Sequence, residues 1–229
     1  MSKKIIFEDR NNDWEIWKKN NSIERSIKRI QNKLPEMEAS KQLSKIVKKI
    51  YKKKNSILDF GCAAGHYYNS LKRIDKEINY CGFDVTKDYI SYAKKYFKKE
   101  KNTNFDVQSL FSMSKKYNNK FDIVFCANVL HHLPSIDIPL KNLINASKKY
   151  CIIRTLVSDN THLARFYYDD SSNRKGELNN FQLQNTYSYN LIRKKIKKIG
   201  NFKVTFENDI FNGRNINKEF TSKERKKYP

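Results

Sequence analysis

The 229-residue sequence contains no apolar run of about 18 residues, the minimum for a helix that crosses a membrane. Residues 1–8 also lack the long apolar segment of a secretory signal. We therefore expect a cytoplasmic protein with no membrane span. Hydrophobic residues make up 38% and aromatic residues 13% of the chain, which is enough for one domain with a substantial core.

Cysteine is scarce, and its spacing excludes the common metal and redox motifs. The chain has 4 cysteines, none in a C-x-x-C pair, and three of them lie in or beside expected strands. We expect reduced, buried thiols that act as small hydrophobic residues, with no disulfide and no bound metal. They are Cys62, Cys81, Cys126 and Cys151.

Acidic residues are few relative to basic ones: 24 Asp and Glu against 47 Lys and Arg give a formal net charge of +23. One explanation is a basic surface that binds the phosphates of a nucleic acid. The other is the codon bias of an AT-rich genome. We favour codon bias, because the lysines are spread over expected helix surfaces and no arginine-rich or aromatic-interleaved tract stands out.

Expected strands and helices alternate from residue 56 onward, which predicts a parallel sheet with helices on both faces. The expected strands are 56–60, 79–84, 104–107, 121–127 and 150–157, with a further one at 202–210. The expected helices in this part of the chain are 67–74, 87–99, 138–148 and 187–199.

The most informative stretch is an apolar segment that turns acidic and then passes through two glycines. Residues 57–60 suit a buried strand that contains Asp59, and Gly61 and Gly65 permit a tight turn before a helix. Glycine has no Cβ, so a ligand can approach the backbone closely. Taken alone, such a turn can also bind a dinucleotide or nothing at all.

Residues 59–65 resemble motif I of the class I S-adenosylmethionine (SAM) dependent methyltransferases, D/E-x-G-x-G-x-G, with Ala63 at the middle glycine. The resemblance implies that Asp59 helps to orient the amino-acid end of SAM, often through water, because the ammonium group of SAM suits a carboxylate. A dinucleotide has a pyrophosphate there, which the carboxylate would repel. The resemblance places the cofactor against Asp59, Phe60, Gly61, Cys62, Ala63 and Gly65.

A second carboxylate, Asp84, ends the next expected strand and is followed by Val85. It lies roughly twenty residues beyond the glycine turn, where a carboxylate can accept hydrogen bonds from both ribose hydroxyls of a nucleoside. In the resembled family the matching residue has this role. The alternative is a helix N-cap, a position that Thr86 or Asp88 could fill equally well.

The adenine contact departs from the family pattern. After the strand that ends at 107, family members commonly carry an acidic residue that meets the adenine amino group. Here Ser109 has that place, followed by Leu110. A backbone N–H could still read the adenine edge, so we expect both residues at the cofactor.

Residues 121–133 resemble the fourth-strand motif of the family, F-D-x-V-x-x-x-x-V-L-H-H-L. The resemblance places Asn128 and Val129 close to the sulfonium and the transferred methyl group. His131 and His132 follow as the obvious acid–base candidates, since histidine titrates near neutral pH. The alternatives are that the histidines pack against the cofactor or cap the following helix, and that alignment alone carries methyl transfer without a base.

The acceptor side is less distinct. Polar and aromatic residues that follow the fifth strand suit a hydroxylated ligand such as a sugar, although ordinary loop residues would look the same. The candidate contacts are Arg154, His162, Arg165, Tyr168 and Tyr187.

The resemblance implies a Rossmann-like class I methyltransferase fold, with a mostly parallel seven-stranded sheet, helices on both faces and an N-terminal helical extension. We expect this extension at 1–54, either as a cover for the cofactor site or as an added layer. The SAM-binding domain is expected at 55–211, with a substrate loop insertion at about 158–186, before a charged tail at 212–229.

The expected activity is SAM-dependent methyl transfer to oxygen or nitrogen of a small molecule, with a sugar or glycosylated metabolite as first choice. An RNA or tRNA methyltransferase is the alternative that the charge suggests, although Ala127-Asn128-Val129-Leu130 replaces the N-P-P-Y motif of base-nitrogen chemistry. A non-enzymatic alternative is a SAM-binding regulatory or partner subunit.

Overall fold

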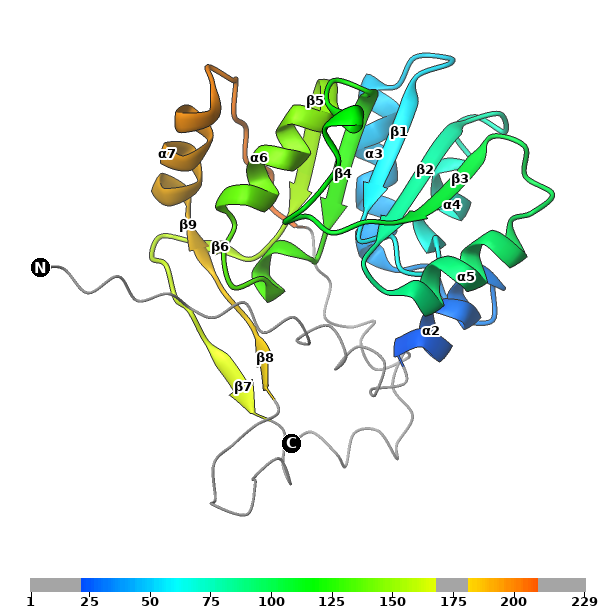
Figure 1. The fold of residues 1–229 in the computed structure, drawn as a ribbon, viewed down its shortest axis with the longest axis horizontal. Helices are drawn as coiled ribbons and strands as arrows, with labels where there is room; N and C mark the ends of the chain where they lie inside the picture. Colours follow the sequence, from blue (N-terminus) through cyan, green and yellow to red (C-terminus); the bar gives the residue numbers. More distant parts are fainter. Residues whose placement is uncertain (1–21, 168–180, 210–229) are drawn as a thin grey trace, which may run out of the picture.

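The computed structural model describes residues 22–167 and 181–209, and its centre is a parallel sheet of five strands in the order β3-β2-β1-β4-β5 (Figure 1). Three of the strands have the bounds predicted from sequence. The strands are β1 (Ser56–Phe60), β2 (Asn79–Asp84), β3 (Thr103–Val107), β4 (Phe121–Ala127) and β5 (Ser147–Arg154). The central strand β1 pairs with β2 on one side and β4 on the other.

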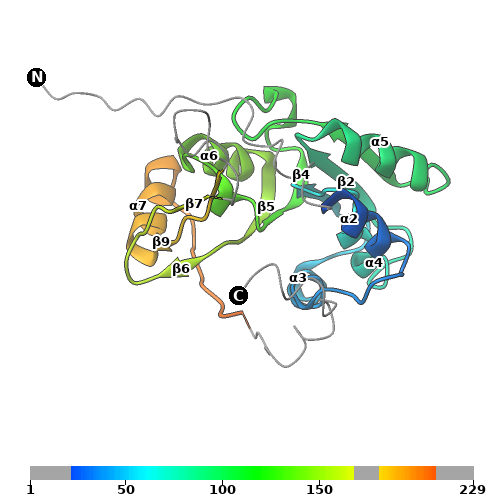
Figure 2. The ribbon, with the colours of Figure 1, turned by 90° about the horizontal axis from the view of Figure 1, so that it is seen from below.

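Both faces of the sheet are covered by helices, because consecutive apolar residues of the inner strands point to opposite sides. Ile57 belongs to one core cluster and Leu58 to the other, and both are fully buried. One face packs against α2 (Ser22–Ile30), α3 (Glu38–Ile50), α4 (His66–Leu71) and α5 (Lys87–Tyr96). The other packs against α6 (Asp137–Ala146), which lies opposite α3 and α4 in Figure 2.

The expected seven-stranded sheet is not observed: the main sheet of the described residues has five strands. The prediction of a strand at 202–210 is wrong for residues 202–209, which form no strand. This segment stays mostly exposed, with Phe202 49% exposed, so its alternating residues never gain the buried face that stabilises a strand.

The expected insertion at 158–186 contains short strands. β6 (Val157–Ser158) pairs in parallel with β9 (Tyr187–Ser188), while β7 (Arg165–Tyr167) pairs antiparallel with β8 (Phe181–Leu183). Figure 1 shows β7 and β8 projecting away from the main sheet. Helix α7 (Tyr189–Ile199) starts two residues later than predicted, since the preceding residues form β9, and Ser188 caps it by accepting the Leu191 N–H.

The cysteines and the length of the helices complete the description of the fold. All four cysteines are free thiols, three buried and Cys151 partly buried. In the part of the chain that the structure describes, no helix is both long and apolar enough to span a bilayer.

Candidate active site

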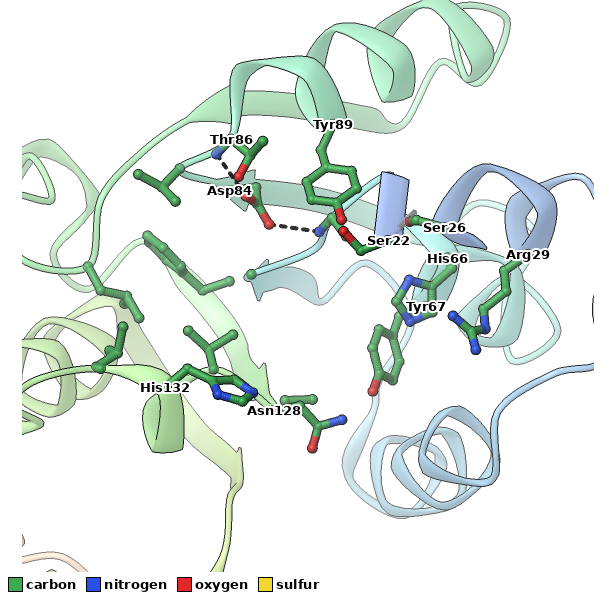
Figure 3. A pocket seen from close by; sticks show the side chains of 18 of the residues that line it. Ser22, Ser26, Arg29, His66, Tyr67, Asp84, Thr86, Tyr89, Asn128 and His132 are labelled. Atoms are coloured by element: carbon green, nitrogen blue, oxygen red, sulfur yellow. Dashed lines mark hydrogen bonds between the residues drawn. The ribbon is translucent and has the colours of Figure 1, made fainter. Parts of the chain in front are cut away.

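A pocket of about 290 Å³ opens at the carboxyl ends of the parallel strands, where ligands bind in open α/β sheets (Figure 3). The glycine turn, the ends of β2 and β4, and the loop after β3 form much of its wall. Nine of the residues predicted to contact the cofactor line it: Phe60, Gly61, Ala63, Asp84, Val85, Ser109, Leu110, Asn128 and Val129. Asp59, Cys62 and Gly65 are not among its lining residues.

The glycine turn is packed so closely that Gly61 has no space for a side chain. Its φ is +81°, and its N–H donates to the Phe83 carbonyl oxygen at 2.7 Å. A Cβ at this position would lie 2.2 Å from Cγ2 of Val129. Ala63 also has a positive φ, of +48°, which turns its N–H toward the next strand. The turn therefore brings bare backbone to the edge of the pocket.

Asp84, the last residue of β2, stabilises this turn through a hydrogen bond. Its Oδ2 accepts the Ala63 N–H at 2.9 Å, and its Oδ1 accepts the Thr86 N–H at 2.8 Å at the start of α5. Burial raises the pKa of this carboxyl, and the two backbone N–H groups counteract that rise. A carboxylate oxygen can accept more than one hydrogen bond, so both oxygens retain capacity for ribose hydroxyls. Asp84 thus serves the helix terminus and also fits a nucleoside.

The part of the pocket predicted to hold adenine shows the same departure from the family pattern as the sequence. Ser109 Oγ accepts the Phe111 N–H at 3.2 Å, and Leu110 is buried beside it. The acidic residue of β3, Asp106, instead accepts hydrogen bonds from Gln108 and Tyr117.

The two adjacent histidines point to different places. His132 lines the pocket, and its Nδ1 lies 2.7 Å from the Leu183 carbonyl oxygen. Because that oxygen only accepts, Nδ1 carries the proton of the neutral ring and Nε2 carries the lone pair. Burial lowers the pKa of His132, so the ring stays neutral at a lower pH than an exposed histidine does. Figure 3 shows its ring directed into the pocket beside Asn128.

His131 is not a pocket-lining residue, although the sequence placed it with His132 as a candidate base. It is 6% exposed, and its Nδ1 lies 3.5 Å from Thr155 Oγ1. Burial, aided by His132 and Arg154, lowers its pKa to about 3. This is the position of a packed core histidine, which the sequence did not predict.

Asp59 lies deeper than the predicted contact with the cofactor requires. Its Oδ2 accepts the Tyr80 hydroxyl at 2.6 Å, and burial raises its pKa to about 8. Any role in orienting the ammonium group of SAM, as predicted, would have to be indirect.

The buried Asp59 carboxyl gives a stability prediction. Its folded pKa of about 8 exceeds the ordinary 3.8, so between these values the folded state holds a proton that the unfolded state has lost. Wild-type stability therefore falls as the pH rises through this window. We expect Asp59→Asn, measured without cofactor, to be more stable than wild type at pH 8 and to lose this advantage near pH 4. Thermal unfolding across this pH range checks it, and equal slopes for the two proteins would contradict it.

The predicted acceptor contacts do not line the pocket. Arg154 donates to Asn128 Oδ1 and forms an ion pair with Asp209. His162 is exposed and forms an isolated backbone bridge, while Arg165 lies 4.8 Å above the Phe181 ring.

Tyr187 and Tyr168 are the other two predicted acceptor contacts. Tyr187 is a core residue, 4% exposed, whose hydroxyl donates to the Leu130 carbonyl oxygen at 3.1 Å. The ring packs under the fourth-strand motif, so the structure gives Tyr187 a structural role, and the acceptor contact stays a prediction. Tyr168 lies outside the described residues.

Several lining residues were missed from sequence. Ser22, Ser26 and Arg29 come from α2, and His66 and Tyr67 come from the first turn of α4. The last two directly follow Gly65, a position that could have drawn attention to them. The sequence around the α2 residues contains no motif that predicts a binding role, because they reach the pocket only when that helix packs on the sheet.

Comparisons with known proteins show the family of this chain. A family model described as a methyltransferase domain matches residues 51–217. The tRNA U34 carboxymethyltransferase of Helicobacter pylori (strain G27) is 31% identical over 109 residues, which cover 45% of this chain and 41% of that protein. The mitochondrial ubiquinone biosynthesis O-methyltransferase of Saccharomyces cerevisiae is 31% identical over 114 residues, covering 45% of this chain and 34% of that protein.

Solved structures show the same fold. The N-terminal domain of EvdMO1, crystallised in the presence of SAH and D-fucose, has a TM-score of 0.51 at 12% identity and covers 72% of this chain and 74% of that chain. The chain thus spans less than half of the length of the curated relatives it matches, but most of a solved domain. The match to the family model covers well over half of the chain, so this protein belongs to the methyltransferase-domain family.

Proposed function

We propose that the protein transfers the methyl group of SAM to a hydroxyl oxygen of a small molecule, and that His132 accepts the hydroxyl proton. SAM supplies an electrophilic methyl group when bound. The observation that carries the proposal is the orientation of His132: the Leu183 carbonyl oxygen lies 2.7 Å from Nδ1, which makes Nε2 the basic nitrogen of a ring directed into the pocket.

The balance of the reaction favours oxygen over nitrogen as the acceptor atom. A new O–CH₃ bond forms as the S–CH₃ bond breaks, SAH leaves, and the proton moves to Nε2. A neutral hydroxyl is a weak nucleophile that benefits from a base, whereas an amine can attack before it loses a proton. The lowered pKa of His132 keeps it neutral and able to accept a proton. The yeast relative is an O-methyltransferase by name, which supports this choice.

The remaining lining residues hold the donor. Asp84 is suited to the ribose hydroxyls, and the close approach of Gly61 to Val129 shapes the turn under the methionine part. Helix α2 covers the pocket through Ser22, Ser26 and Arg29, which supports the first reading of the N-terminal extension, a cover for the cofactor site. Among hydroxyl acceptors, we propose saccharides or glycosylated metabolites as the first class to test.

A tRNA acceptor is the second candidate. It is supported by the net charge of +23 and by the local match to the Helicobacter enzyme, whose name specifies tRNA U34. That match covers 41% of the relative, so it supports the shared donor-binding domain more strongly than the acceptor. Membership of a family of enzymes makes the regulatory-subunit alternative the weakest.

We expect His132→Gln to lower turnover by about a hundredfold or more, the usual contribution of a general base, with little change in SAM affinity. The assay is transfer of labelled methyl from SAM into a small-molecule extract, and calorimetry gives the affinity. His131→Gln is the matched control, because it removes the neighbouring ring from outside the pocket. Equal turnover losses in the two variants would contradict a base role for His132.

A further inference from the structure

The wall of the pocket formed by the start of α4 contains a hydroxyl with no partner. Tyr67 is 2% exposed, and its Oη has no hydrogen-bond partner among the described residues. Its ring packs edge-on against Phe125 with centroids 5.5 Å apart, which fixes its direction. Figure 3 shows the hydroxyl directed into the pocket toward Asn128. Burial raises the pKa of this phenol, so it remains a hydrogen-bond donor.

The preceding residue adds a second group of the same kind. Both ring nitrogens of His66 are buried without a hydrogen-bond partner in the described part of the chain, and its ring lies 4.5 Å from that of Tyr67. Burial and the positive charge of Arg29 lower its pKa to about 3. The ring is therefore neutral and offers one N–H donor.

Arg29 brings a positive charge to the same wall from a different element. Helix α2 is attached to the glycine turn, since Ser26 Oγ accepts the Ala64 N–H at 3.1 Å inside the protein. One turn further along α2, Arg29 lines the pocket beside His66 (Figure 3). The positive charge of Arg29 also acts on Tyr67, because it opposes the rise of the Tyr67 pKa that burial causes. The guanidinium and the Tyr67 hydroxyl are therefore close enough to interact electrostatically.

Buried polar groups without partners destabilise a fold, so such groups facing a pocket indicate a ligand that satisfies them. Two neutral donors and a guanidinium complement an anion with several acceptor atoms. We propose that Arg29, His66 and Tyr67 form a subsite for a ligand carboxylate. The amino-acid part of SAM carries one such group, and an acidic acceptor would carry another. The subsite would select carboxylated ligands whichever acceptor atom is methylated, and so does not depend on the O-methyl proposal.

The test is calorimetry with SAH and with its decarboxylated analogue, S-adenosyl-3-thiopropylamine. If the carboxylate belongs to the donor, wild type should prefer SAH by about tenfold to a hundredfold, the range for hydrogen bonds to a charged group. Arg29→Gln and Tyr67→Phe should each remove most of this preference by weakening SAH binding alone. The controls are Lys28→Gln, which removes a charge from the exposed side of α2, and Tyr68→Phe, whose hydroxyl contacts Glu100 instead. Both should keep the wild-type preference.

A second arm identifies a carboxylate that belongs to the acceptor. Wild-type protein saturated with SAH is titrated with sodium acetate and followed by NMR of the tyrosine and histidine side chains. If wild type shows no preference for SAH, saturable shifts at Tyr67 that are lost in Arg29→Gln would support the subsite with an acceptor carboxylate. Absence of both the SAH preference and the acetate shifts would overturn the proposal. Circular dichroism of each variant confirms that the fold is retained.

Discussion

Gly61→Ala should abolish measurable SAM binding, with a loss of more than a hundredfold. The added Cβ would lie 2.2 Å from Val129 Cγ2, far inside van der Waals contact. The positive φ of +81° costs about 1–2 kcal/mol for a residue with a Cβ, and overpacking adds about 1–3 kcal/mol. Ala63 tolerates a positive φ of +48° in the same turn, so the collision with Val129 decides the outcome. Both residues line the pocket, and relief of the collision must deform it.

Calorimetry with SAM measures this loss, and thermal unfolding separates it from global instability. Gly200→Ala is the matched control: its φ of 172° is ordinary extended backbone, and the added Cβ would meet only the half-exposed Phe202 ring, which can move. The control should bind SAM as wild type does. A Gly61→Ala protein that binds SAM within threefold of wild type would refute the close approach of the turn to the ligand.

Asp84→Asn should weaken SAM binding by about tenfold to a hundredfold, the cost of losing hydrogen bonds to a charged group. The substitution keeps the size of the side chain but removes the negative charge that two ribose hydroxyls would share. It also replaces an acceptor oxygen with an NH₂ group, which cannot accept the N–H of Ala63 or of Thr86. The glycine turn would therefore loosen on the side that faces the cofactor.

The control is Asp88→Asn, which removes an equal charge from the exposed first turn of α5, four residues further along the chain. Its SAM affinity should match that of wild type. Adenosine serves as a second ligand, because it shares the ribose but lacks the amino-acid part. Asp84→Asn should weaken adenosine and SAM by similar factors, and a loss confined to SAM would contradict a ribose role.

The sequence predicted the parts of the site that depend on local geometry. The strand ends at Phe60 and Asp84 coincide with the predictions, because apolar runs that end in glycine or a carboxylate have few alternatives in a buried parallel sheet. Asn128 and Val129 reached the pocket for the same reason, as the residues that follow β4.

Sequence and structure differ where tertiary contacts decide the position of a side chain. The sequence around Tyr187 is typical of a binding residue. Its place in the core could not be predicted, because it depends on a hydrogen bond to a carbonyl group 57 positions earlier in the chain. His131 and His132 are equivalent in a motif, but the short helix that contains them turns one ring toward Thr155 and the other toward the pocket. The contribution of Arg29 requires α2 to dock on the glycine turn, which no local pattern encodes.

The most direct test of the proposed function is incubation of the protein with SAM labelled in its methyl group and with an extract separated into small molecules, glycans, RNA and protein. The account predicts label in the small-molecule fraction, in an acid-stable methyl ether, and much less label with the Asp84→Asn variant at a SAM concentration below its Kd. Label that enters RNA and is released as nucleosides by nuclease would contradict a small-molecule acceptor and establish the tRNA candidate. A methylated amine in the small-molecule fraction would contradict transfer to oxygen.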